Sequence, residues 1–552
     1  MKRTKANIDI PSNLTQSQLL LWTGQELNPG VPLYNMALTF ELKSAIDPKH
    51  FSHAFQILVD NCDAMRTVFL VADGIPQQRV RLNFNYQLLL LDWSKDPQAG
   101  VRLAKWVRDR SKKLLDISVC AFDSVLIKLA DDRFVWYLNQ HHLITDAWGV
   151  SVLYHSMAEL YQKLLEGAHD DFPVLPSFRD YLKHEQSQQS NDGRDEIKTY
   201  WHEKISQLPA TPRLYGHAEQ VIGTIAKRIT VDLGIERSNR LRELTQEHDL
   251  RAWTQHLALY NIFATVLFAY LYRVTGQQHL AIGTPAHNRP TPQFKQTPGV
   301  FIELFPLFAE LEEGESFSTL LARVRAEVNG FLRYAQPGST SASLNRCFHT
   351  VLNYIHAAFS DFNGIPMQST WVHPDHCDPG HHLRLQVHDF DASGNIQLHF
   401  DLNAEVFDEP TRKAVPQHFL SLLDAFIEDR GQPIAKPAIL TKWEYDHTIN
   451  LLNKTTDKQP TLPTVIDSFV EQASRFAQEP AVFFGGQRLT YQVLDEKSNQ
   501  LAHYLINNDV GPGQRIALYL KRSPELLIGI WGVLKAGAAY IPIAINYPRE
   551  RV

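Results

Sequence analysis

The chain has 552 residues, of which 44% are hydrophobic and 21% are charged, a composition typical of folded globular proteins. Its 54 Lys and Arg against 60 Asp and Glu give a net charge of −6, which argues against nucleic acid as a partner, because phosphate-binding proteins are basic. Four cysteines are too few for a disulfide framework, and the N-terminus has no apolar stretch of the kind found in signal peptides. We therefore expect a cytoplasmic protein.

The first elements of the chain predict a mixed α/β fold. Residues 34–43 alternate apolar and polar side chains as a strand does. Residues 47–61 predict a helix, because five apolar side chains fall on one helical face: Phe51, Ala54, Phe55, Leu58 and Val59. Asp73-Gly74 separates two apolar runs and predicts a hairpin turn.

The most informative local sequence is QHHLITDAWG at residues 140–149. It lies between two predicted paired strands, at 122–130 and 134–140, and an amphipathic helix at 147–166. Such a turn brings side chains and free backbone N–H groups to one point. A histidine there can exchange a proton near neutral pH.

Plainer interpretations of the same turn stay open. His141 and His142 could equally be structural histidines that are packed in the core. Asp146 could be the N-cap of the following helix, a position that favours aspartate. A metal centre is not expected, since Asp146 is the only further ligand that the turn offers.

Four other segments concern the domain organisation or imitate a membrane span or a metal site. Residues 185–195 are polar and predict a surface excursion, and residues 452–463 predict a linker. Residues 526–545 are as apolar as a membrane span, but Lys535, three glycines and Pro542 favour a buried helix, a turn and a buried strand, so no membrane is expected. The histidine-rich segment 373–382 matches no common zinc spacing, so we expect a polar loop there.

Six segments in chain order resemble the signature motifs of the condensation domains of nonribosomal peptide synthetases. The turn HHLITDA at 141–147 resembles the family's H-H-x-x-x-D-G motif. The other five lie at 15–22, 63–69, 178–181 (followed by Trp201), 282–290 and 299–307. Six motifs in one order are far more specific than any one of them.

The resemblance implies an α/β fold made of two chloramphenicol-acetyltransferase-like halves, 12–205 and 206–445, arranged as a V-shaped pseudo-dimer around a channel. One carrier's phosphopantetheine arm would enter from each side, and the chain itself would bind no cofactor. The loop at 373–382 would lie near the channel mouth. The implied function is amide bond formation between a carrier-bound donor acyl thioester and a carrier-bound acceptor aminoacyl group.

The resemblance also implies roles for the turn. His142 would be the catalytic residue, as a general base or as the group that orients the amine. His141 and Asp146 would be motif residues with a structural role, and Asp146 would pair with Arg289 of the other half.

The backbone N–H groups of Ala147, Trp148 and Gly149 are candidates for stabilising the oxyanion. Two residues depart from the motifs. Ala147 replaces the motif's glycine, and Glu303 places an extra carboxylate near the channel.

A second resemblance covers the end of the chain. Residues 489–494 (LTYQVL) and 534–543 (LKAGAAYIPI) resemble two motifs of adenylate-forming domains. We therefore predict a linker at 446–462 and an N-terminal fragment of an adenylation domain at 463–552. The fragment shows no phosphate loop, so its ATP site would be incomplete and the fragment inactive alone.

The order of the two resemblances implies partners. We expect a donor carrier protein that acts in trans, and the rest of the adenylation domain and the acceptor carrier beyond Val552. An aminoacyl or peptidyl donor is favoured over a fatty-acyl donor. Two alternatives stay open, namely an epimerisation domain of the same superfamily and a non-catalytic platform that docks carriers. The intact His142 and Asp146 argue against the platform.

Overall fold

The structure is a computed structural model, which divides into two compact units, Met1–Tyr445 and Asp446–Val552. It describes residues 12–168, 172–189, 194–206, 213–216, 221, 223–356, 359–389, 394–454, 463–550 and 552.

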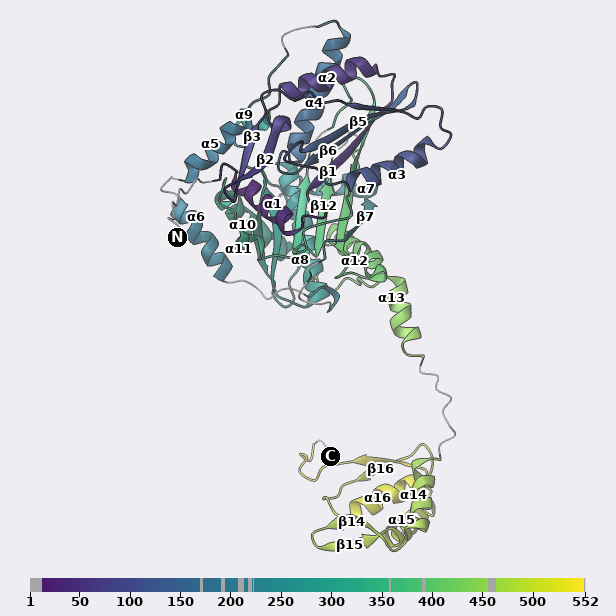
Figure 1. The fold of residues 1–552 in the computed structure, drawn as a ribbon. Coiled ribbons are helices and arrows are strands. Elements are labelled where there is room, and N and C mark those ends of the chain that lie inside the picture. The colour runs from purple at the N-terminus through teal and green to yellow at the C-terminus, as the bar shows by residue number, and fades with distance from the viewer. Residues whose placement is uncertain are drawn as a thin grey trace, which may run out of the picture. The chain divides into compact units, whose positions relative to one another are not determined.

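The first unit contains a five-stranded sheet with strand order β11-β1-β6-β5-β4 (Figure 1). Helices α2 and α4 pack together over one face, where Phe40 and Trp136 are buried, and α3 covers the other face, where Tyr137 is buried. The elements are β1 (Asn35–Leu42), α2 (Pro48–Asp60), β4 (Leu89–Asp92), α3 (Ala99–Ser111), β5 (Phe122–Ala130), β6 (Arg133–His141), α4 (Ala147–Leu165) and β11 (Met367–Val372).

The local predictions for this layer are confirmed. All five apolar side chains assigned to one face of α2 are buried. The predicted hairpin joins β2 (Thr67–Ala72) to β3 (Ile75–Val80), and its two turn residues, Asp73 and Gly74, have φ of 51° and 80°. Two left-handed residues in succession give the turn the twist that a two-residue hairpin needs.

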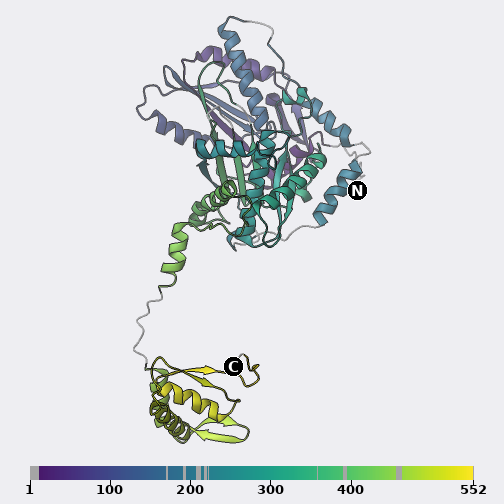
Figure 2. The same ribbon diagram turned by 180° about the vertical axis from the view of Figure 1, so that it is seen from behind.

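The second sheet has six strands in the order β7-β13-β12-β10-β8-β9. Helices α8, α10 and α12 pack against it and against one another, and they bury the largest apolar core of the described residues. Figure 2 shows the ribbon of these teal and green helices from behind. The elements are β7 (Ala226–Asp232), α7 (Gly234–Leu244), α8 (Gln255–Thr275), β8 (His279–Ala286), α9 (Pro292–Lys295), β9 (Glu303–Glu310), α10 (Phe317–Tyr334), α11 (Ala342–Asn345), β10 (Thr350–Ile355), β12 (Leu383–His388), β13 (Gln397–Asn403) and α12 (Glu409–Glu428).

Helix α8 is the one described helix whose length and apolarity would suffice to cross a membrane. In the structure, 72% of its most apolar window is buried inside the protein. Helix α8 is therefore buried as a central helix of the protein core.

The predicted boundary at residue 205/206 does not separate the two sheets completely. Strand β11, from the second half of the chain, pairs antiparallel with β1. Phe359 and Phe362, which precede β11 in the chain, also enter this core and pack beside Phe40 and Trp136. The second half therefore completes the core of the first.

The segment predicted as a surface excursion at 185–195 lies mostly at the surface where the structure describes it, but it is helical and not irregular. Helix α5 (Phe178–Gln189) runs through its first part, and α6 (Arg194–Ser206) begins at its end. Glu185 is buried and accepts the Gln16 N–H at 2.8 Å. Residues 190–193 lie outside the described residues.

The second unit is a small α/β body. It contains α14 (Val465–Arg475), β14 (Pro480–Phe484), β15 (Gln487–Thr490), α15 (Tyr491–Ile506), β16 (Arg515–Leu518), α16 (Pro524–Lys535) and β17 (Ala539–Pro542). The helix, turn and strand predicted within 526–545 are present as α16, Gly537 with φ of 78°, and β17. The predicted burial of the strand is wrong, because all four residues of β17 are exposed. The segment predicted as a linker begins with the end of α13 (Lys442–Asp446) and a π-helical turn at His447–Leu451. Residues 455–462 lie outside the described residues.

Candidate active site

The histidine turn has the predicted strand–turn–helix geometry. Strand β6 ends at His141, and the His142 N–H donates to the Tyr34 carbonyl at 2.8 Å. Asp146 caps α4, because its carboxylate accepts the Gly149 N–H at 2.7 Å. The turn is thus fixed at both ends by backbone groups.

A cavity of about 520 Å³ lies beside this turn and is lined from both halves of the unit. The first half contributes α1 (Gln16–Leu27), residues 34–36 and the turn itself. The second half contributes residues from β7, β9, β10 and β12 and from the loop after β11. His142, Ala147 and Trp148 all line the cavity.

His142 is the catalytic candidate whose side chain reaches the cavity. Its Nδ1 atom is buried and has no hydrogen-bond partner among the described residues. Burial lowers the pKa of its imidazole, and the nearby Asp146 carboxylate only partly opposes that shift. A neutral imidazole at the wall of a cavity can accept a proton from a substrate or hold an amine.

His141 fits the structural interpretation. It does not line the cavity, it is buried, and its Nδ1 accepts the Leu143 N–H at 3.2 Å. Burial lowers the pKa of its imidazole to about 3, with a smaller contribution from His142. His141 is therefore neutral and anchors the turn.

The structure brings Asp146 and Arg289 together, as the resemblance implied. Asp146 Oδ1 lies 2.8 Å from Arg289 Nη2, and the two side chains are only 1% and 4% exposed. Asp146 Oδ2 accepts the Phe301 N–H at 2.9 Å, and Arg289 also donates to the Thr297 carbonyl at 2.7 Å. The carboxylate thus serves both as the N-cap of α4 and as the ion-pair partner from the other half.

The suggestion that Gly149 supplies an oxyanion donor is wrong. Its N–H already donates to Asp146, and the residue does not line the cavity. Ala147 and Trp148 remain the candidates from this turn.

Gly149 instead permits close packing between the halves. A Cβ atom there would lie 2.9 Å from Thr145 Oγ1 and 3.2 Å from the Gly299 backbone. We predict that Gly149→Ala lowers the stability by about 1–3 kcal/mol through overpacking, measured as a drop in melting temperature. Gly100→Ala in α3 is the matched control, because nothing lies within 4 Å of its added carbon. Equal melting of the two variants would contradict this prediction.

Glu303 lies in the cavity wall at the start of β9. Its carboxylate accepts the N–H groups of Gly338 at 2.6 Å and Thr340 at 3.0 Å. Burial and the nearby Glu185 carboxylate raise the pKa of Glu303 to about 8. The Glu303 carboxyl group, which is largely uncharged at neutral pH, therefore holds a loop of the second half in place.

The histidine-rich segment 373–382 is an irregular loop, as predicted, and it forms part of the cavity wall. Sequence reasoning missed two arginines beside it, Arg228 on β7 and Arg384 on β12, which line the same cavity. No motif connects these residues, which are far apart in the sequence.

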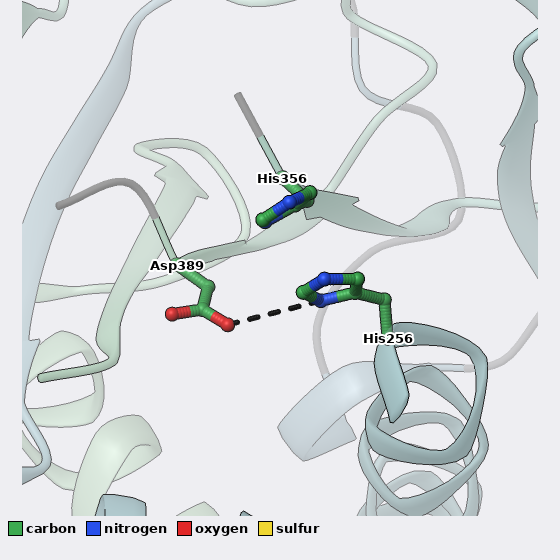
Figure 3. A group of neighbouring side chains, drawn as sticks. All are labelled: His256, His356 and Asp389. Atoms are coloured by element: carbon green, nitrogen blue, oxygen red, sulfur yellow. Dashed lines mark ion pairs between the residues drawn. The ribbon is translucent and has the colours of Figure 1, made fainter. Parts of the chain in front are cut away.

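A second cluster, His256, His356 and Asp389, resembles a metal site in composition (Figure 3). The two imidazole rings are stacked with their centres 3.6 Å apart. The lone pair of each imidazole nitrogen lies in the plane of its ring, and the planes of two stacked rings are nearly parallel. The two histidines therefore cannot both bind one metal ion unless a ring rotates. The Asp389 carboxylate is also paired with Arg242 at 2.8 Å. This geometry favours a hydrogen-bonded polar cluster.

Comparison with protein families gives two matches. The family model "Condensation domain" matches residues 11–448, and the model "AMP-binding enzyme" matches residues 469–552.

Two curated relatives match almost the whole chain. It is 24% identical over 554 residues to "Dimodular nonribosomal peptide synthase" of Bacillus subtilis (strain 168), covering 99% of this chain and 23% of the relative. It is 24% identical over 563 residues to "Bacitracin synthase 3" of Bacillus licheniformis, covering 98% of this chain and 8% of the relative. The chain thus spans less than a quarter of the length of these two relatives.

Two solved structures are similar in fold. A starter condensation domain of rhizomide synthetase, solved with C8-CoA, has a TM-score of 0.68 at 22% identity and covers 77% of this chain and 97% of its own. The first condensation domain of the CDA synthetase has a TM-score of 0.68 at 18% identity and covers 78% of this chain and 100% of its own. The predicted fold class is confirmed.

Proposed function

The chain belongs to the condensation-domain family of nonribosomal peptide synthetases, and from that premise we propose that its first unit joins a donor acyl thioester to an acceptor amine. Amide bond formation is the function of this family. The observation that carries the proposal is His142, a neutral imidazole that lines a cavity formed from both halves of the unit.

The chemistry needs three things from the protein. The amine must be held at attacking distance from the thioester carbonyl, its proton must be removed, and the oxyanion must be stabilised. His142 serves the first or the second task. The Ala147 and Trp148 N–H groups, at the positive end of the 19-residue helix α4, would serve the third. The thiolate that leaves then takes up the proton.

Condensation domains work with carrier protein domains of these synthetases. We propose that one carrier delivers the donor and a second delivers the acceptor on phosphopantetheine arms, and that the two meet in the cavity at His142. The chain itself would need no bound cofactor for this reaction.

The proposal can be tested against its two alternatives in one experiment. The protein is mixed in D₂O with separately loaded donor and acceptor carriers, and the carriers are analysed by intact mass spectrometry. We expect an amide on the acceptor carrier. Deuterium incorporation at the α-carbon without an amide would indicate epimerisation, and unchanged carriers would indicate a docking platform.

The lowered pKa of His142 predicts the pH dependence of the reaction. A protonated imidazole cannot accept the amine's proton, and burial keeps the imidazole neutral below its ordinary pKa of about 6.5. The acceptor amine also loses reactivity as it is protonated, so each single-turnover rate is first divided by the unprotonated fraction of that amine. The corrected rate should stay constant as the pH is lowered past about 6.5 and should fall only at lower pH. A loss of half the corrected rate at the ordinary imidazole pKa would contradict this prediction.

We also propose that the second unit does not use ATP. Its one Gly-Gly pair, Gly485-Gly486, forms the turn between β14 and β15 with φ of 52° and 82°. A phosphate loop would instead join a strand to a helix N-terminus. Amino-acid-dependent exchange of pyrophosphate into ATP should stay at background for the 552-residue chain. Exchange above background would overturn this proposal.

A further inference from the structure

Two arginines of the second sheet face the cavity that contains His142. Arg228 lies on β7 and Arg384 on β12, and both line the cavity. Arg384 is close enough to His142 to contribute to the lowered pKa of that imidazole. The arginines are therefore near the place where the substrates would react.

A buried carboxylate between them organises this pair. Asp401, on β13, is fully buried and accepts from Arg228 Nε at 2.6 Å, Arg228 Nη2 at 2.9 Å, Arg384 Nη2 at 3.2 Å and Gln386 Nε2 at 2.8 Å. Two carboxylate oxygens have about four acceptor positions, so Asp401 is saturated. Two guanidinium charges share one carboxylate, and this group of three side chains keeps one positive charge.

The group presents one partly exposed guanidinium, that of Arg384, to the cavity. The Arg228 side chain is only 10% exposed, and its Nη1 atom is buried with no hydrogen-bond partner among the described residues. A neighbour on the cavity wall, His381, likewise has a buried ring nitrogen without a hydrogen bond there. Both atoms are too buried for a ligand in the cavity to reach, whereas Arg384 lines the cavity with a side chain that is 27% exposed and donates only to Asp401 among the described residues.

The groups on this wall decide the kind of ligand. Burial lowers the pKa of His373 to about 3 and that of His381 to about 4, so both imidazoles are neutral. Asp378 adds a second negative charge to the same wall: it accepts from the Tyr34 hydroxyl at 3.3 Å and the Gly380 N–H at 2.9 Å, and its charge acts on Arg384 although the two form no ion pair in the described part of the chain. The ligand is therefore defined by the free N–H groups of Arg384 and not by a net charge of the wall. A planar guanidinium with free N–H groups binds a carboxylate best.

We propose that Arg384 and Arg228, fixed by Asp401, form a carboxylate-binding subsite that selects a substrate with an acidic side chain. The inference rests on the proposed function, because the ligand is then an aminoacyl or peptidyl thioester. The thioester uses the substrate's own α-carboxyl group, so the recognised carboxylate belongs to a side chain of the donor or of the acceptor.

Rates of amide formation with matched acid and amide substrates test the subsite. In one arm the donor is fixed and the acceptor carrier is loaded with Asp or Asn, then with Glu or Gln. In the other arm the acceptor is fixed and the donor is varied in the same way. Because each pair is nearly identical in shape, we expect the acid to be preferred at least about tenfold in kcat/KM in one arm. Equal rates for acid and amide in both arms would overturn the proposal.

Three variants separate selection from structure. Arg384→Gln should remove the preference, Arg384→Lys should retain part of it, and Arg346→Gln, which alters another arginine of the same cavity wall, should leave it intact. If Arg384→Gln slows acid and amide substrates equally, the arginine serves every substrate and the proposal is wrong. If circular dichroism shows that Arg384→Gln does not fold, the proposal is judged by whether the wild-type protein prefers acid over amide substrates.

Failure of the proposed function would look different, because no substrate pair would yield an amide. The subsite would then be tested by calorimetry with the α-amides of N-acetyl-aspartate and N-acetyl-asparagine as probes, in which the α-carboxyl group is blocked. Tighter binding of the acid by the wild type than by Arg384→Gln supports the subsite, and equal binding of the two probes overturns it.

Discussion

His142→Ala should reduce amide formation by about 10²–10⁴-fold, the usual contribution of a general acid–base group, while the fold stays intact. The imidazole lines the cavity, and its Nδ1 atom has no hydrogen-bond partner in the described chain that its loss would leave unpaired. Single-turnover transfer between loaded carriers would measure the rate, and the melting temperature would report on folding.

A histidine elsewhere provides the control for this variant. His53 is exposed on α2, so His53→Ala should change neither the rate nor the melting temperature. Undiminished turnover by His142→Ala with fully loaded carriers would remove His142 from the chemistry.

Asp146→Ala should destabilise the first unit by about 3–5 kcal/mol, the typical cost of removing one partner from a buried ion pair. Arg289 would remain buried without its carboxylate, and the N–H groups of Gly149 and Phe301 would lose their acceptor. The loss of the α4 N-cap acts in the same direction. A large fall in the melting temperature, or insoluble protein, is the expected result.

Two further variants show whether charge or capping dominates. Asp146→Asn keeps an acceptor for the backbone but removes the charge, so it should lie between the wild type and Asp146→Ala. Glu159→Ala removes an exposed helical ion pair with Lys163 and should cost no more than about 0.5 kcal/mol. A fully stable but slow Asp146→Ala enzyme would instead assign Asp146 to catalysis.

Local structure could be predicted from the sequence where apolar spacing decides it. The buried face of α2 and the Asp73-Gly74 hairpin follow from periodicity and turn chemistry alone. Polarity placed the segment 185–195 at the surface, but it does not reveal that the segment is helical or that α5 buries the Glu185 carboxyl group.

The site could be predicted only in part. The strand–turn–helix geometry around His142 is local, but the partner of Asp146 lies 143 residues away, and only the resemblance to a family pointed to it. The group formed by Arg228, Arg384 and Asp401 depends on strand order and register, because three strands place these residues side by side. Such contacts have no signal in local spacing.

Transfer of the donor acyl group between carriers tests the central claim most directly. A labelled donor thioester on one carrier is mixed with an aminoacyl-loaded second carrier and the 552-residue protein, and the acceptor carrier is analysed by mass spectrometry at successive times. The account predicts that the label appears on the acceptor carrier as an amide, at a rate that depends on the protein and is lost in His142→Ala. Donor and acceptor carriers that keep their original loads in the presence of the wild-type protein would contradict it.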